Sequence, residues 1–188
     1  YGHFLYSAGA AAVRLGRRLG RPSFVAVGEG TLWSVRPLGV AAAKGDFAGV
    51  TGAVAVSTPI RERLVGDLGF PPDRVRVFPN GVDRSVFYPR SREAMREKYG
   101  LPFDAFLVAF VGNFLDSKGV RRVASAIDGL EGVGGVFVGA GPDVPVASNV
   151  VFRRFAARTE VPEILSAADC FVLPSDAEGS SNATLEAL

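Results

Sequence analysis

"AFLVAFVGNFLDSKGVRRVASAIDGLEGVGGVFVGAGPD", residues Ala105–Asp143, holds the pattern that decides the fold. It begins and ends with apolar runs that have the length and composition of buried strands. Between these runs Val120, Val123 and Ile127 recur at helical spacing, which predicts a helix with one apolar face. Strands that are apolar on both faces and are joined by a helix predict a parallel sheet covered on both sides.

The same alternation of strands and helices continues on both sides of this stretch. The further elements that we expect are strands at 23–27, 52–57, 150–152 and 170–173, helices over 58–69 and 159–169, and a last helix that starts near Ser180 or Ser181. In the last-but-one helix Thr159 is the expected cap, and in the helix of 120–130 Leu130 is expected on the apolar face. The charged stretch 89–104 is bounded by prolines and predicts an interdomain linker with a short helix in it. The sequence thus predicts an α/β protein with domains at 1–88 and 105–188.

Composition excludes several classes of protein. Of the 188 residues 48% are hydrophobic, and the net charge of +2 is too small to indicate binding to nucleic acid. One cysteine, Cys170, cannot form a disulfide within the chain, which fits a cytoplasmic protein, and we expect it to be a buried structural thiol. The basic stretch Arg14–Pro22 is a candidate contact with an anionic membrane surface, but a solvated helix face is the favoured interpretation.

Ligands of parallel sheets bind at the carboxyl ends of the strands, so the loops after the predicted strands are the informative ones. Gly139 and Gly141 would let a ligand approach the backbone, although a plain tight turn explains them as well. Lys118 lies at the start of a predicted helix, where an ammonium group could clamp a diphosphate; the alternative is a surface lysine.

The chain ends on two carboxylates, Glu178 and Glu186, on either side of the last predicted helix start. The amides of such a start suit phosphate, and a carboxylate beside a phosphate site can accept hydrogen bonds from ribose or sugar hydroxyls. The alternatives are a solvent-facing helix side chain for Glu186 and a partner of the helix dipole for Glu178.

Four motifs occur in one order along the chain: "VFPNGVDRSVFYP", "FVGNFLDSKGVRRVASAI", "VFVGAGPD" and "EILSAADCFVLPSDAEGSSNATLEAL". In this combination the sequence resembles the retaining glycosyltransferases of family GT4. The resemblance implies the GT-B architecture, which has two Rossmann-like parallel-sheet domains. It implies that 1–88 is the C-terminal part of the acceptor-side domain and that 105–188 is the N-terminal part of the nucleotide-sugar donor domain. Both domains would be incomplete, and we expect such a fragment to be inactive by itself.

The resemblance also implies roles for individual residues. Glu186 would hold the nucleotide ribose, Glu178 would face the donor sugar as a catalytic residue, and Lys118 would meet the diphosphate as a second one. The further substrate-binding residues implied are Gly112, Asn113, Gly139, Gly141, Arg154, Phe155, Ala156, Gly179, Ser180, Ser181 and Asn182. Of these, Arg154, Phe155 and Ala156 belong to the loop that would pass the base.

Two positions depart from the family pattern. Asn113 stands where the family often has an arginine, which leaves the diphosphate clamp one charge short. His3 matches a first-domain histidine of the family and is a candidate acceptor-side residue, with a structural role as the alternative. A second histidine of the family has no match, and Glu29 is a candidate substitute or a plain turn residue.

The function implied is transfer of a sugar from a nucleotide-sugar to an acceptor hydroxyl with the anomeric configuration retained. Lys118 and the amides near Ser181 would stabilise the charge that grows on the leaving diphosphate. We expect no metal and no resident cofactor, a nucleotide-sugar co-substrate of unknown base, and a glycan, lipid or small-molecule acceptor. The alternatives are a nucleotide-sugar epimerase or phosphorylase of the same architecture, and a non-catalytic nucleotide-sugar binding module. The protein would work in the cytoplasm, with peripheral contact to the membrane left open.

Overall fold

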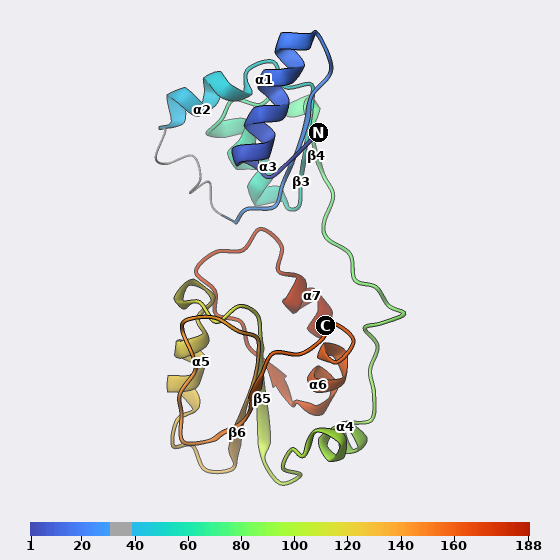
Figure 1. Cartoon of the computed structure of the whole chain (residues 1–188), viewed down its shortest axis with the longest axis vertical. Helices are drawn as coiled ribbons and strands as arrows, with labels where there is room; N and C mark the ends of the chain where they lie inside the picture. The colour runs from blue at the N-terminus through green and yellow to red at the C-terminus, as the bar shows by residue number, and fades with distance from the viewer. Residues whose placement is uncertain (31–38) are drawn as a thin grey trace. The chain divides into compact units, whose positions relative to one another are not determined.

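The computed structural model describes residues 1–30 and 39–188, which form two compact units (Figure 1). Unit 1 is made of Tyr1–Asn80 and Glu178–Ser180, and unit 2 of Gly81–Ala177 and Ser181–Leu188. Each unit contains its own four-stranded sheet, and every strand pair in both sheets is parallel. The α/β fold with two parallel sheets that the sequence predicts is thereby confirmed.

In unit 1 the strands lie in the order of the chain, β1-β2-β3-β4. Their bounds are Gly2–His3 for β1, Phe24–Val27 for β2, Gly52–Ala55 for β3 and Val75–Val77 for β4. The helices are α1 (Ala10–Leu19), α2 (Val40–Phe47) and α3 (Thr58–Gly66), with shorter helical segments at Leu5–Gly9 and Pro72–Arg74. Buried side chains from the sheet and all three helices share a single hydrophobic core.

In unit 2 the strand order is β7-β6-β5-β8. The strands are β5 (Phe106–Val111), β6 (Val133–Val138), β7 (Val150–Arg154) and β8 (Cys170–Phe171). The helices are α4 (Arg92–Tyr99), α5 (Val120–Ile127), α6 (Val161–Ala167) and α7 (Asn182–Ala187), with a helical turn at Asp116–Lys118. The chain moves outward from β5 through β6 to β7 and then crosses to the other side of β5. The strand order therefore reverses between β5 and β8, and open α/β sheets bind ligands at such a reversal.

The two faces of the second sheet are covered by different helices. Leu107 and Ala109 of β5 belong to the core cluster that includes α6, whereas Val108 and Phe110 belong to the cluster under α5. Figure 1 shows α5 on one side of β5 and β6 and α6 on the other. The strictly apolar sequence of β5 follows from this arrangement, because both faces of the strand are buried.

The boundary between the units differs from the linker expected at 89–104. The units divide between Asn80 and Gly81, and α4 belongs to unit 2. Arg96 of α4 is only 5% exposed and donates hydrogen bonds to the Ala167 carbonyl at 3.0 Å and to Asp169 at 2.6 Å. One buried arginine within a charged stretch thus fastens the predicted linker helix to the second sheet.

Several details of the helix ends also differ from expectation. Helix α5 ends at Ile127, so Leu130 lies beyond it and is 51% exposed. The residue that precedes α6 is Glu160 rather than Thr159, and it makes no capping hydrogen bond with its side chain. Cys170 is free and half-buried in β8, rather than fully buried.

The basic stretch of unit 1 lies on α1 and makes contacts within the unit. Arg14 forms a salt bridge of 2.6 Å with Asp46, and Arg17 donates to the backbone carbonyls of Gly45 and Asp46. Both arginines therefore bind the last turn of α2, where carbonyl groups favour positive charge. Among the described residues no helix combines the length and apolarity that crossing a bilayer requires.

Candidate functional site

The loops that follow β5 and β6 are packed backbone against backbone. The Gly112 N–H donates to the Val138 carbonyl at 3.0 Å, and the Phe114 N–H donates to the Ala140 carbonyl at 2.9 Å. A Cβ atom on Gly139 would lie 1.9 Å from the Gly112 oxygen, and one on Gly141 would lie 2.3 Å from the Phe114 oxygen. Gly139 and Gly141 are therefore required by the contact between two protein loops, whether or not a ligand also approaches them.

Asp143 joins these two loops through its side chain. One carboxylate oxygen accepts a hydrogen bond from the Asp116 N–H at 2.6 Å, and the other pairs with Arg121 at 2.9 Å. The Asp143 N–H in turn donates to the Phe114 carbonyl at 3.0 Å. Asp143 was not among the predicted site residues, because nothing in its local sequence points to a partner amide 27 positions earlier.

The loop after β8 meets the loop after β5 at the reversal of strand order. The Asp176 N–H donates to the Ser117 carbonyl at 2.9 Å, and the Asp176 carboxylate pairs with Arg122 at 2.8 Å. Gly119 has a φ of 76°, and a Cβ atom there would lie 2.4 Å from the Pro174 oxygen. Lys118 lies between Ser117 and Gly119, where the loops that follow β5, β6 and β8 meet. Asn113 belongs to the same loop as Lys118.

The loop after β7 presents one aromatic ring to solvent. Arg154 pairs with Glu160 at 2.6 Å, so its charge is matched within the loop, and Ala156 is 7% exposed. Phe155 between them is 72% exposed. The Gly139 N–H donates to the Arg154 carbonyl at 3.0 Å, which ties this loop to the exit of β6. Of the three residues predicted to pass a base, Phe155 is the most exposed.

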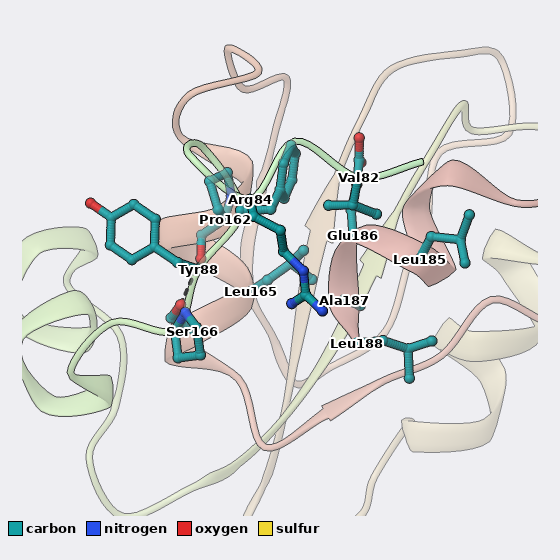
Figure 2. Close-up of a pocket in the computed structure, with 12 residues that line it drawn as sticks. Val82, Arg84, Tyr88, Pro162, Leu165, Ser166, Leu185, Glu186, Ala187 and Leu188 are labelled. Carbon is teal, nitrogen blue, oxygen red and sulfur yellow. Dashed lines mark hydrogen bonds between the residues drawn. The ribbon is translucent and has the colours of Figure 1, made fainter. Parts of the chain in front are cut away.

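Helix α7 begins as the sequence predicts. The Ser181 hydroxyl accepts a hydrogen bond from the Thr184 N–H at 3.2 Å and caps the helix. Glu186 lines a pocket of about 180 Å³ between the segment 82–89 and helices α6 and α7, and Figure 2 shows it among the surrounding residues. Burial raises the pKa of the Glu186 carboxyl above its ordinary value, and the positive charge of Arg158 opposes this rise.

Three predicted site residues, Glu178, Gly179 and Ser180, pack within unit 1. A Cβ atom on Gly30 would lie 2.4 Å from the carbonyl carbon of Glu178, and one on Gly179 would lie 2.1 Å from the Gly28 oxygen. The Asn80 side-chain amide donates to the Ser180 carbonyl at 3.2 Å. The predicted residues are thus divided, since Ser181, Asn182 and Glu186 belong to unit 2.

Glu29 has a structural role at the edge of the first sheet. One of its carboxylate oxygens accepts from the Leu5 N–H at 2.7 Å, and the other accepts from the Gly28 N–H at 3.1 Å. It joins the turn after β1 to the end of β2 with its two oxygens and is a poor candidate for a general base. His3, the last residue of β1, is exposed and lies 3.0 Å from the Tyr1 hydroxyl through Nδ1.

Two family models match the chain and together span nearly all of it. The model described as Glycosyltransferase Family 4 matches residues 1–86, and the one described as Glycosyl transferases group 1 matches residues 105–188. The chain belongs to glycosyltransferase family 4. The second match covers the loops after β5, β6 and β8, which meet near Lys118.

The chain is similar to curated proteins that carry different names. The chain is 33% identical over 156 residues to the alpha-maltose-1-phosphate synthase of Mycolicibacterium smegmatis, an alignment that covers 72% of this chain and 40% of that protein. It is 30% identical over 147 residues to the D-inositol 3-phosphate glycosyltransferase of Acidothermus cellulolyticus, covering 66% of this chain and 33% of that one. The chain therefore spans 33% to 40% of the length of these curated relatives.

Solved structures of the same fold include nucleotide complexes. Sucrose-phosphate synthase from Thermosynechococcus elongatus superposes with a TM-score of 0.81 at 18% identity, covering 98% of this chain and 52% of that one. Anabaena Alr3699/HepE in complex with UDP superposes with a TM-score of 0.78 at 17% identity, covering 100% of this chain and 57% of that one. At such identities the likeness establishes the fold that this family-4 chain shares with them.

Proposed function

We propose that this chain belongs to an enzyme that transfers a sugar from a nucleotide-sugar donor to an acceptor hydroxyl with retention of the anomeric configuration. In this proposal unit 2 binds the nucleotide of the donor and unit 1 binds the acceptor. The observation that carries it is the meeting of three strand exits at Lys118, where the strand order of the second sheet reverses. Solved structures with this fold include complexes with UDP and with UDP-glucose, which supports a nucleoside diphosphate as the ligand of that edge.

The chemistry is charge stabilisation. When the bond between the anomeric carbon and the diphosphate breaks, the leaving group gains negative charge, and a fixed ammonium group stabilises that charge more than it stabilises the donor. We assign this role to Lys118, with the neutral Asn113 side chain as an additional hydrogen-bond donor. We assign the nucleotide ribose to Glu186, the donor sugar to Glu178 and the base to the exposed ring of Phe155.

In this proposal no step of the reaction is routed through a metal ion. The Lys118 ammonium would supply the positive charge at the diphosphate that a divalent cation supplies in metal-dependent phosphate sites. The lone cysteine, Cys170, supports a reducing compartment for the protein.

Binding of nucleoside diphosphates tests the proposal directly. Titration of the chain with UDP, ADP and GDP in a calorimeter should give saturable binding for at least one of them. UMP, which lacks the second phosphate, is the control ligand for UDP. It should bind more weakly because it loses contacts to Lys118. Absence of binding for all three diphosphates would contradict the proposal.

A non-catalytic nucleotide-sugar binding module is the second candidate. It is favoured by Glu29, whose two oxygens are both bonded to backbone amides and which therefore cannot replace the histidine that the family pattern leads us to expect. The two candidates differ in turnover. A transferase releases nucleoside diphosphate from the donor in an acceptor-dependent way, whereas a binding module holds the donor intact.

A further inference from the structure

Phe4 has an unusual backbone conformation at the end of the first strand. Its φ of 66° is positive, and no other non-glycine residue among those that the structure describes shares this feature. The left-handed region is uncommon for side chains with a Cβ atom and is a conspicuous outlier for a bulky aromatic residue. Such strain persists only where the surrounding structure holds it, and it concentrates at functional sites.

The surrounding turn holds Phe4 from three directions. The Phe4 N–H donates to the Ala26 carbonyl at 2.8 Å, and the Phe4 carbonyl accepts from the Gly9 N–H at 3.0 Å. The next amide, that of Leu5, donates to Glu29 at 2.7 Å. A Cβ atom on Gly9 would lie 2.4 Å from the Phe4 oxygen, so the turn closes only because residue 9 is glycine.

The strained backbone fixes the ring of Phe4 at the carboxyl edge of the sheet without burying it. Phe4 is 44% exposed, whereas Phe47 and Phe70 in the core of the same unit are 2% and 3% exposed. The His3 ring meets it edge to face at 4.2 Å between centroids. A Cβ atom on Gly28 would lie 3.6 Å from Cε1 of the Phe4 ring. Burial of apolar surface therefore does not explain why this conformation is kept.

A fixed, partly exposed aromatic ring has a definite preference in ligands. The face of an aromatic ring is the negative part of its quadrupole, and it attracts the C–H groups on the apolar face of a saturated ring that carries hydroxyls at its rim. The neighbouring imidazole of His3 can exchange a hydrogen bond with such a hydroxyl. Carbohydrates and cyclitols combine these two features.

We propose that Phe4 is a stacking platform for the ring of a carbohydrate or cyclitol acceptor, with His3 beside it as a polar contact. This inference rests on the proposed function, because it names the acceptor class of the transferase. Phe4 touches the acceptor in this view, whereas Glu29 and Gly9 act through it by holding its backbone.

Saturation-transfer NMR on the complete chain tests the platform, with methyl α-D-glucopyranoside and myo-inositol as the probes. Irradiation of the aromatic protons should transfer saturation to the ring protons of at least one probe. Phe4→Leu should weaken that binding roughly two- to tenfold. Phe24→Leu is the control, because Phe24 is 50% exposed but lies at the amino end of β2. Equal transfer in wild type and Phe4→Leu, or an equal loss in Phe24→Leu, would overturn the proposal.

Phe4→Gly separates a binding role from a structural one. Glycine adopts a positive φ without strain, so this variant should keep the thermal midpoint of the wild type while losing saturation transfer. A lower midpoint with unchanged transfer would show that the ring serves the fold and would overturn the proposal. UDP titration of the same samples keeps the two hypotheses distinct: binding of UDP without any transfer from Phe4 defeats the platform alone, whereas failure to bind any nucleoside diphosphate defeats the proposed function.

Discussion

The carboxylate of Asp143 accepts a hydrogen bond from the Asp116 N–H at 2.6 Å, so the loop after β6 holds the first residue of the turn that carries Lys118. The same carboxylate pairs with Arg121 in the first turn of α5. The position of Lys118 relative to the sheet thus depends on a residue 25 positions later in the chain, because Asp143 fixes the turn from outside.

Replacing Asp143 should weaken nucleotide binding without removing any proposed ligand contact. Asp143→Ala loses both the bond to Asp116 and the pair with Arg121, and we expect about a tenfold rise in the Kd for nucleoside diphosphate, equivalent to about 1.4 kcal/mol. Asp143→Asn keeps an oxygen acceptor for the amide and should lie between wild type and alanine. Calorimetric titration measures both, with Asp73→Ala of unit 1 as the control; an unchanged Kd in Asp143→Ala would contradict this role.

Lys118 and Asn113 should differ in what they contribute to diphosphate binding. A charged donor to phosphate contributes about 1.5–3 kcal/mol and a neutral one about 0.5–1.5 kcal/mol, so Lys118→Ala should raise the Kd for nucleoside diphosphate far more than Asn113→Ala. Lys44→Ala, a lysine of unit 1, is the control and should leave the Kd unchanged. Identical binding by Lys118→Ala and wild type would make Lys118 an ordinary surface residue.

The ring of Phe155 should contribute to binding of the nucleotide base. Stacking of a base on an aromatic side chain contributes about 1–3 kcal/mol, so Phe155→Ala should weaken nucleoside diphosphate binding by about five- to a hundredfold. Phe103 is a matched control, because it is 62% exposed and precedes β5 at the opposite edge of the same sheet. Equal Kd values for the two variants would remove Phe155 from the site.

Glu186 should contribute to nucleotide binding in a way that depends on pH. Glu186→Gln replaces a charged acceptor and should cost about 1.5–3 kcal/mol of nucleotide affinity at neutral pH. Glu178→Gln should leave the affinity for free diphosphate nearly unchanged, because Glu178 is assigned to the sugar. Equal diphosphate affinity in wild type and Glu186→Gln would make Glu186 an ordinary helix carboxylate.

The pH dependence follows from the raised pKa of Glu186. As the pH falls through that raised value the carboxylate takes up a proton and becomes a weaker acceptor. The ratio of Kd values for Glu186→Gln and wild type should therefore be large at neutral pH and approach one in acid; protonation of the ligand's phosphate affects both proteins and cancels. The contribution of Glu186 to folding stability depends on pH in the opposite direction. Because its pKa is raised in the folded state, this group favours folding most at acidic pH and loses that contribution as the pH rises through its pKa in the folded protein.

The buried arginine of α4 should matter far more for stability than its exposed neighbour. Arg96 and Arg92 both pair with Asp169, but their side chains are 6% and 53% exposed. Arg96→Ala removes the buried partner of Asp169 and leaves several backbone carbonyls without their donor, so it should lower the free energy of unfolding by about 3–5 kcal/mol. Arg92→Ala should lower it by about 1 kcal/mol or less. Urea unfolding measures both, and comparable losses would show that burial is not the cause.

The spacing of apolar residues predicts a helix correctly where all of the segment packs on one face. The spacing of Val120, Val123 and Ile127 identified α5 because all three positions are buried against β5 and β6. The same pattern failed at Leu130, since the chain leaves the helix at Asp128 and Gly129 follows with a φ of 71°. A hydrophobic residue in register does not reveal that the helix has already ended.

Contacts between distant loops were beyond the reach of sequence patterns. The hydrogen bond between Asp143 and Asp116 and the burial of Arg96 each depend on one side chain meeting a backbone group far along the chain. Their local sequences, a glycine-rich turn and a charged stretch, predict exposure for both. The cap at Ser181 was predictable for the opposite reason, because a serine and the amide it caps lie within one helical turn.

The contact between the β5 and β6 exits also limits how this edge of the sheet can change during evolution. The atom that a Cβ on Gly139 would meet is the backbone oxygen of residue 112, which every amino acid possesses. A substitution at Gly139 consequently has no suppressor among single side-chain changes at its partner. Lineages that keep this sheet edge must retain the glycine or remodel the length of a loop, so a random-mutagenesis library of this chain should yield revertants of a Gly139 variant almost only at codon 139 itself.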